Sequence, residues 1–102
     1  MAKPVILAID DDPSVLGAIE RDLRSHYRTD YRVMKAGSPG EGLEVATELG
    51  SRNVPVALFL VDQRMPGMTG IELLSKVMTL HPLSRRVLLT AYADTGVAIA
   101  GI

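Results

Sequence analysis

Short apolar runs recur along the chain and predict buried β-strands. The clearest lie at residues 5–9 and 56–61, a shorter one lies at 86–89, and a weaker, partly alternating run lies at 31–36. A continuous apolar run of this length is typical of a strand buried on both faces, as in a parallel sheet, whereas alternation suits an edge strand. We therefore expect a sheet covered on both faces, with 31–36 at an edge.

Helical periodicity follows these runs. Asp12-Pro13 and Ser38-Pro39 each place an N-cap residue before a proline at the first helical position, which predicts two helix starts. A third helix should begin at Thr69 or Gly70 and close at His81-Pro82. The apolar positions expected on the inward faces are Val15, Leu16, Ile19 and Leu23, then Leu43, Val45, Ala46 and Leu49, then Ile71, Leu74, Val77 and Met78.

A fourth helix should begin at Asp94 or Thr95 and run to the chain end. Strands and helices then alternate along the whole chain, which predicts an α/β fold with a parallel sheet and right-handed crossovers. The length of 102 residues suits one domain, and no internal repeat or linker interrupts it.

Composition narrows the class of protein. Hydrophobic residues make up 47% and charged residues 23%, which is typical of a globular domain and excludes disorder. The net charge is −1 and the basic residues are scattered along the sequence apart from Arg85-Arg86, so we expect no direct nucleic-acid contact. The absence of cysteine excludes disulfides and thiolate chemistry. No apolar run suits a membrane span or a signal peptide, so we expect a soluble, cytoplasmic protein without membrane contact.

Acidic side chains follow two of the predicted strands. Asp10 and Asp11 come directly after the first strand and Asp62 after the third, while Asp12 serves as the helix cap. Parallel strands place their carboxyl ends at one edge of the sheet, where open α/β sheets bind ligands. In the flavodoxin-like strand order 2-1-3-4-5 the first and third strands are neighbours, so these carboxylates should face one another. Thr90, after the fourth strand, should lie at the same edge.

Carboxylates held this close repel one another unless one takes up a proton or a cation neutralises them. Oxygen ligands in a partly solvated cleft favour Mg²⁺. The Thr90 hydroxyl is suited to hydrogen-bond an anion at the same place. The pattern therefore predicts a Mg²⁺-assisted phosphate site with an aspartate as nucleophile.

Motifs at the predicted strand ends closely resemble the receiver domain of two-component response regulators. They are Ile9-Asp10-Asp11-Asp12-Pro13, Val61-Asp62-Gln63-Arg64-Met65-Pro66-Gly67-Met68-Thr69-Gly70 and Leu89-Thr90-Ala91-Tyr92, in the family's order. The resemblance extends over essentially the whole chain. It implies the flavodoxin-like (βα)5 fold and a regulatory phosphoacceptor that is not an enzyme in its own right. A sensor histidine kinase would donate the phosphoryl group, and an output domain or a downstream protein would respond.

The resemblance also implies a role for individual residues. Asp62 would accept the phosphoryl group. Asp10, Asp11, Asp62 and the backbone carbonyl of Arg64 would bind Mg²⁺. Thr90 would hydrogen-bond the phosphoryl oxygen and switch rotamer, Ala91 would leave room for the phosphoryl group, and Tyr92 would tune dephosphorylation.

One departure from the family's pattern affects the phosphate site. The family carries a lysine and a proline after a fifth strand, then a fifth helix, and the chain ends before these, so it holds no catalytic lysine. Lys35 and Lys76 fall in other elements. We therefore expect residues 1–102 to be a receiver domain that is incomplete at its C-terminus, as part of a longer protein. The fourth strand would be left as a bare edge, which favours a homodimer or a domain-swapped dimer.

Alternative functions stay open beside this one. A degenerate receiver would keep the acidic residues and act as an unphosphorylated docking or dimerisation module. An aspartate-nucleophile phosphatase usually places a second aspartate two positions after the first, but Arg64 stands there. A P-loop nucleotide-binder lacks its Gly-Lys-Ser/Thr motif, and a flavodoxin-type FMN site would not place acids against phosphate without a metal.

Other side chains have ordinary structural interpretations. Met65 and Met68 are expected to pack rather than to bind a metal. His26 and His81 lie near helix ends, where surface or dipole roles are expected. The run from Leu88 to Thr95 resembles N-terminal receivers fused to a thioredoxin-reductase-like flavoenzyme or to a cyclic-dinucleotide phosphodiesterase, which implies an output domain of one of these kinds.

Overall fold

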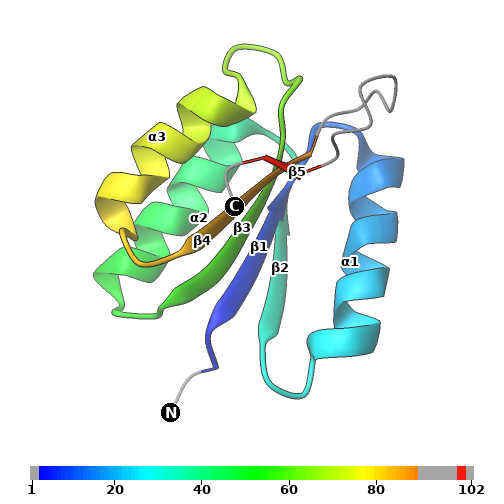
Figure 1. The fold of residues 1–102 in the computed structure, drawn as a ribbon, viewed down its shortest axis with the longest axis vertical. Coiled ribbons are helices and arrows are strands. Elements are labelled where there is room, and N and C mark those ends of the chain that lie inside the picture. Colours follow the sequence, from blue (N-terminus) through cyan, green and yellow to red (C-terminus); the bar gives the residue numbers. More distant parts are fainter. Residues whose placement is uncertain (1–2, 90–98, 101–102) are drawn as a thin grey trace.

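A sheet with the strand order β2-β1-β3-β4-β5 forms the centre of the structure, a computed structural model that describes residues 3–89 and 99–100 (Figure 1). The strands are β1 (Val5–Ile9), β2 (Arg32–Ala36), β3 (Val56–Asp62), β4 (Arg85–Leu89) and β5 (Ile99–Ala100). The helices are α1 (Pro13–Tyr27), α2 (Pro39–Ser51) and α3 (Gly70–Leu80). β1 pairs in parallel with β2 and β3, and β3 pairs in parallel with β4. This arrangement confirms the predicted flavodoxin-like α/β fold.

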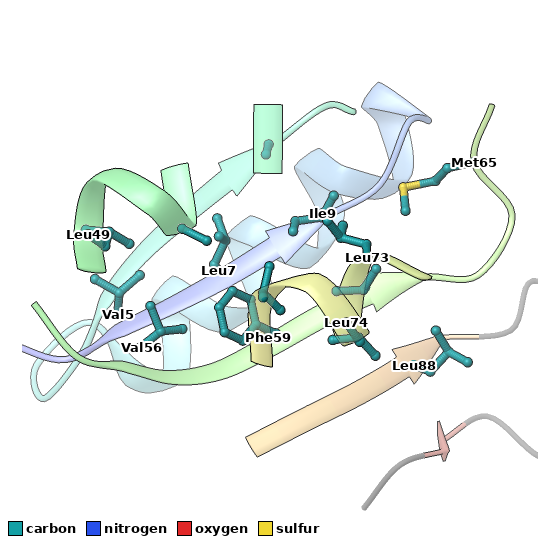
Figure 2. Packing of buried hydrophobic residues seen from close by; sticks show 14 residues of the cluster. Val5, Leu7, Ile9, Leu49, Val56, Phe59, Met65, Leu73, Leu74 and Leu88 are labelled. Carbon is teal, nitrogen blue, oxygen red and sulfur yellow. The ribbon is translucent and has the colours of Figure 1, made fainter. Parts of the chain in front are cut away.

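The helices cover the two faces of the sheet unequally. α2 and α3 pack side by side on one face, and α1 lies alone on the other (Figure 1). The main apolar cluster lies between the sheet and the α2–α3 layer. It includes Phe59 of β3, Leu49 of α2 and Leu73 of α3, with Phe59 in its middle and Leu49 near Val5 (Figure 2). On the α1 side, Leu58 and Leu60 are half-buried, and Leu16 is the buried residue of α1. The core is therefore concentrated on one side of the sheet.

The helices begin where their caps predict. The Asp12 side chain accepts hydrogen bonds from backbone N–H groups of the first turn of α1, and Ser38 Oγ accepts one from the Glu41 N–H at 3.1 Å. Thr69 and Glu72 form a reciprocal capping box at the start of α3. These side chains satisfy donors that would otherwise lack partners at a helix start. In the described part of the chain, no helix is long and apolar enough to cross a membrane.

The buried face of α3 differs from the prediction at Ile71 and Leu73. Ile71, expected inward, is 57% exposed, whereas Leu73 is completely buried. The buried residues of α3 are Gly70, Leu73, Leu74 and Val77. They follow the 3–4 spacing of a helix face, and Ile71 falls outside that face.

The position of His81 also differs from the prediction of a surface role. The side chain is buried, and its Nε2 lies 2.8 Å from the carbonyl oxygen of Ala46 in α2. A carbonyl oxygen only accepts, so the ring donates this hydrogen bond. The ring also packs against Phe59, with 5.7 Å between the ring centroids. His81 thus joins α2 to the end of α3.

The far edge of the sheet differs from the prediction as well. Ile99 and Ala100 pair antiparallel with Leu89 and Leu88, so the helix predicted to run to the chain end is wrong at these two positions. The rest of that predicted helix lies outside the described residues. β5 covers part of the β4 edge that was expected to be bare, because an open strand edge offers backbone groups to any nearby extended segment. Within residues 3–89 and 99–100 the sheet has no parallel fifth strand.

Candidate functional site

The parallel sheet brings the acidic residues to one edge. β1 and β3 are neighbours, and Ile9 stands opposite Val61 in their register. The next residue along the chain is an aspartate in both cases. Asp10 directly follows β1 and Asp62 is the last residue of β3, so both lie at the same edge of two neighbouring strands. The adjacency of the first and third strands is therefore what assembles the site.

The carboxylates of Asp10, Asp11 and Asp62 form one cluster. One oxygen from each residue lies within 4.8 Å of the others. Asp10 is only 5% exposed and Asp62 only 8%, while Asp11 lies in solvent contact. The geometry brings together all three carboxylates that the sequence singled out and leaves one side of the cluster open.

Asp12 has a different task from its neighbours. Its Oδ1 accepts a hydrogen bond from the Ser14 N–H at 2.9 Å and so caps α1, as predicted. Its own N–H donates to Asp10 Oδ1 at 2.9 Å. The helix start thus holds the Asp10 carboxylate in place, and Asp12 itself points into the cap rather than into the cluster.

Burial and mutual repulsion disfavour the charged form of the cluster. Burial raises the pKa of Asp62 above its ordinary value, the charges of Asp10 and Asp11 raise it further, and backbone N–H groups of Arg64 and Gln63 lower it. Burial likewise raises the pKa of Asp10; the hydrogen bond from the Asp12 N–H lowers it, and the charges of Asp11 and Asp12 raise it. These carboxylates are held close together at an electrostatic cost.

The loop after β3 fixes the direction of Asp62. The Gln63 N–H donates to the Leu89 carbonyl at 3.0 Å, and the Gln63 carbonyl accepts from the Gly70 N–H at 3.1 Å. The Gln63 side chain adds a bond, since its Oε1 accepts from the Ile71 N–H at 3.1 Å. The loop from Gln63 to Gly70 turns at Gly67, whose φ of +83° favours glycine. Asp62 is thus presented by a loop fastened both to β4 and to α3.

Gly70 is a positioning residue that sequence reasoning treated only as a helix start. A Cβ at this position would lie 2.5 Å from the Asp62 carbonyl oxygen and 2.5 Å from Leu88 Cδ1. The start of α3 therefore approaches the end of β3 more closely than any side chain permits. The sequence signal was the glycine itself, directly after the Thr69 cap, but only the packing shows why it is needed.

The remaining predicted site residues are placed as follows. Met65 is buried in the core cluster and Met68 packs partly against it, which confirms that they pack. Arg64 is exposed, and its backbone N–H bonds the Asp62 carboxylate. Thr90, Ala91 and Tyr92 lie outside the described residues. Lys35 lies in β2, and its Nζ contacts Glu20 of α1 at 3.0 Å.

The donor set fits a hard divalent cation. The cluster offers carboxylate oxygens only, and among the described residues it is the one group of acidic, histidine or cysteine side chains close enough to share an ion. Mg²⁺ and Ca²⁺ prefer oxygen ligands, and Mg²⁺ keeps several waters on its open side. A cation here would offset the repulsion that burial intensifies.

Comparison with known proteins adds independent evidence. Residues 6–102 match the family model described as the response regulator receiver domain. The chain is 35% identical over 97 residues to the hydrogenase transcriptional regulatory protein HoxA of Cupriavidus necator, and this alignment covers 95% of the chain and 18% of HoxA. The chain thus spans less than a fifth of the length of this relative.

Solved structures give the same result. The CheY-like receiver domain protein of Methanospirillum hungatei superposes with a TM-score of 0.74 at 32% identity, over 93% of this chain and 70% of that chain. A response regulator from Burkholderia pseudomallei superposes with a TM-score of 0.72 at 26% identity, over 92% of this chain and 51% of that chain. The latter structure contains a phosphorylated aspartic acid, a calcium ion and citrate.

Proposed function

Because this chain belongs to the response regulator receiver domain family, we propose that it accepts a phosphoryl group on Asp62 in a Mg²⁺-dependent reaction and so controls an output. The observation that carries the proposal is the cluster at the sheet edge, where Asp62 lies within 4.8 Å of two further carboxylates. The phosphorylated aspartic acid and calcium ion of the Burkholderia pseudomallei relative support the same assignment.

The proposed reaction is a transfer between two protein side chains. A carboxylate oxygen of Asp62 attacks the phosphorus of a phosphohistidine on a sensor kinase, the new O–P bond forms and the N–P bond breaks. The electron pair of the broken bond stays on the histidine nitrogen, which takes a proton from solvent. The backbone N–H group of Arg64 holds the Asp62 carboxylate for this attack, and the bond from the Gln63 N–H to the Leu89 carbonyl fixes the backbone beside it.

Asp10, Asp11, Asp62 and the backbone carbonyl of Arg64 would hold Mg²⁺ in this account. When bound, the ion supplies positive charge that offsets the carboxylates and the oxygens of the transferred group. Asp10 is held for that task by the Asp12 N–H, and Asp11 stands at the open side of the cluster, where solvent reaches it.

The response to phosphorylation is assigned to residues after β4. Thr90 would hydrogen-bond the phosphoryl oxygen, Ala91 would leave room for it and Tyr92 would tune its loss. The partners in this proposal are a sensor histidine kinase and an output domain or downstream protein, with a homodimer or domain-swapped dimer as the assembly. The name of the HoxA relative points to transcription as one kind of output.

Phosphorylation from a small donor tests the proposal. Acetyl phosphate with Mg²⁺ should add about 80 Da to the intact chain, and the increase should disappear with EDTA and in Asp62→Asn. Asp22→Asn removes one negative charge from the exposed face of α1 and is the matched control, which should phosphorylate like the wild type.

Two results would overturn the proposal. An equal mass gain in Asp62→Asn would move the reaction to another residue. No gain in the wild type, together with no heat of Mg²⁺ binding in calorimetry, would favour a degenerate receiver that docks without phosphorylation.

A further inference from the structure

Basic residues that are scattered in the sequence gather around the free edge of β2. They are Lys3, Arg24, Arg28, Arg32 and Lys35, here called the basic edge. With Tyr31, Val33 and Met34 they line a groove of about 720 Å³. Its lining residues come mainly from β2 and the end of α1. β2 is the terminal strand of the sheet and lies next to α1 (Figure 1). Basic residues that are scattered along the sequence therefore lie together in the folded molecule.

The charge of the groove is strongly positive although the chain as a whole carries −1. Glu20 is the one acid in the lining, and it is shared by Arg24 at 3.1 Å and Lys35 at 3.0 Å. Within the described part of the chain, no acidic side chain pairs with the guanidinium groups of Arg28 or Arg32. The groove can therefore bind a negatively charged partner.

The backbone of β2 is open on the same side. The Arg32 N–H donates to the Pro4 carbonyl, and the Ala36 carbonyl accepts from the Asp10 N–H, so these residues of β2 face β1. Successive residues of a strand point their N–H and C=O groups to opposite sides. Val33 and Lys35 therefore turn theirs toward the groove, and β2 is the terminal strand of the sheet there. Such an edge can receive another strand.

We propose that the basic edge binds an acidic polypeptide segment that adds to the sheet as an extended strand beside β2. Acidic side chains of the segment would pair with Arg28 and Arg32, and its backbone would pair with Val33 and Lys35. This occupant fits the groove better than two others. A nucleic acid would pair with the positive charges but not with the backbone groups of Val33 and Lys35. A second copy of β2 would bring the same positive charges against the groove and would be repelled. This surface lies apart from the carboxylate cluster, so its partner is distinct from the phosphoryl donor's contact with Asp62.

A fluorescein-labelled peptide of alternating Glu and Val tests the proposal against the intact chain. The peptide should bind, binding should weaken with salt, and the backbone amide signals of Val33 and Lys35 should move in ¹⁵N NMR spectra. Arg28→Glu/Arg32→Glu should weaken binding at least tenfold. Arg85→Glu/Arg86→Glu is the matched control, because these two exposed arginines begin β4, which β1 and β3 separate from β2 in the sheet. This double variant should bind the peptide within about twofold of the wild type.

Two modified probes separate strand addition from general attraction. A peptide with Gln in place of Glu should lose binding because it lacks charge, and a Glu-Val peptide N-methylated on alternate residues should lose binding because it cannot pair with a strand. Retained binding of the N-methylated peptide, or equal weakening by both double variants, would overturn the proposal. Tighter binding of duplex DNA than of the peptide, with the same sensitivity to Arg28 and Arg32, would replace it with a nucleic-acid surface. Thermal unfolding by circular dichroism checks that both double variants fold like the wild type.

Discussion

Replacing Asp62 with asparagine should stabilise the metal-free protein. Asparagine keeps the shape of the side chain but removes a charge that lies within 4.8 Å of carboxylate oxygens of Asp10 and Asp11. Coulomb's law gives about 3.5 kcal/mol for one such pair at an effective dielectric constant near 20 and about 0.9 kcal/mol in water. Asp11 is exposed to solvent, so the smaller energy applies to the pair of Asp11 with Asp62, and the larger one applies to the buried pair of Asp10 with Asp62.

Part of this gain is offset by weaker hydrogen bonds. The N–H group of Arg64 donates to a charged carboxylate in the wild type and would donate to a neutral amide oxygen in the variant, a loss of roughly 1 kcal/mol. Taking the larger Coulomb energy for the pair with Asp10 and the smaller one for the pair with Asp11, and subtracting this loss, we expect Asp62→Asn to raise the free energy of unfolding by about 3 kcal/mol at pH 7. For a domain of this size that corresponds to a rise of roughly 15 °C in the melting temperature.

The pH dependence follows from the direction of the pKa shift. The pKa of Asp62 is raised in the folded state above its ordinary value of 3.8, so the folded protein keeps this proton at pH values where the unfolded chain has lost it. The repulsion is therefore absent below that ordinary value and develops as the pH rises through the folded-state pKa. The gain in the free energy of unfolding from Asp62→Asn should grow as the pH rises from the ordinary pKa of aspartate through the folded-state pKa of Asp62, and it should level off above that pH.

Urea unfolding in EDTA, followed by circular dichroism between pH 3.5 and pH 7.5, measures this effect, with Asp22→Asn as the control for loss of one charge. Mg²⁺ should then stabilise the wild type more than the variant, since it binds the folded state through the charged cluster. The reasoning is wrong if Asp62→Asn is no more stable than the wild type at pH 7, or if Asp22→Asn gains as much.

Four further substitutions test how the fold supports the site. Gly70→Ala should lower stability by about 1–3 kcal/mol, because its Cβ would overlap the end of β3; urea unfolding measures this, and a change below 0.5 kcal/mol would refute the close approach. Asp12→Ala should cost about 0.5–2 kcal/mol through the lost cap, and it should weaken Mg²⁺ binding in calorimetry only slightly, since Asp12 points into the helix start. Leu73→Ala should cost about 2–5 kcal/mol while Ile71→Ala should cost less than about 0.5 kcal/mol in the same assay, and the reverse order would contradict the orientation of α3.

Local signals in the sequence predicted most of the fold. The Asp-Pro and Ser-Pro pairs predict helix starts because cap and proline act within one turn, and the structure has caps at Asp12 and Ser38. Continuous apolar runs predicted the buried strands, because a strand covered on both faces is apolar at every position. β1 is indeed buried along its whole length. The meeting of Asp10 with Asp62 required one more step, namely the strand order of an open α/β sheet.

What the sequence did not predict depends on contacts between distant segments. Ile71 and Leu73 are both apolar and close together, so periodicity over a few residues could not say which one faces the core. His81 is buried because α2 offers it the Ala46 carbonyl, which is 35 positions away in the chain. The basic edge arises in the same way, since the turn after α1 brings Arg28 and Arg32 beside Lys3. Composition and residue spacing do not predict such contacts between distant segments.

Mapping the phosphorylated residue tests the central claim most directly. The chain would be treated with acetyl phosphate and Mg²⁺, the acyl phosphate reduced with borohydride to homoserine, and the digest sequenced by tandem mass spectrometry. The account predicts homoserine at position 62 alone, and none when EDTA replaces Mg²⁺. Homoserine at Asp10 or Asp11, or a label at position 62 that does not depend on the divalent cation, would contradict it.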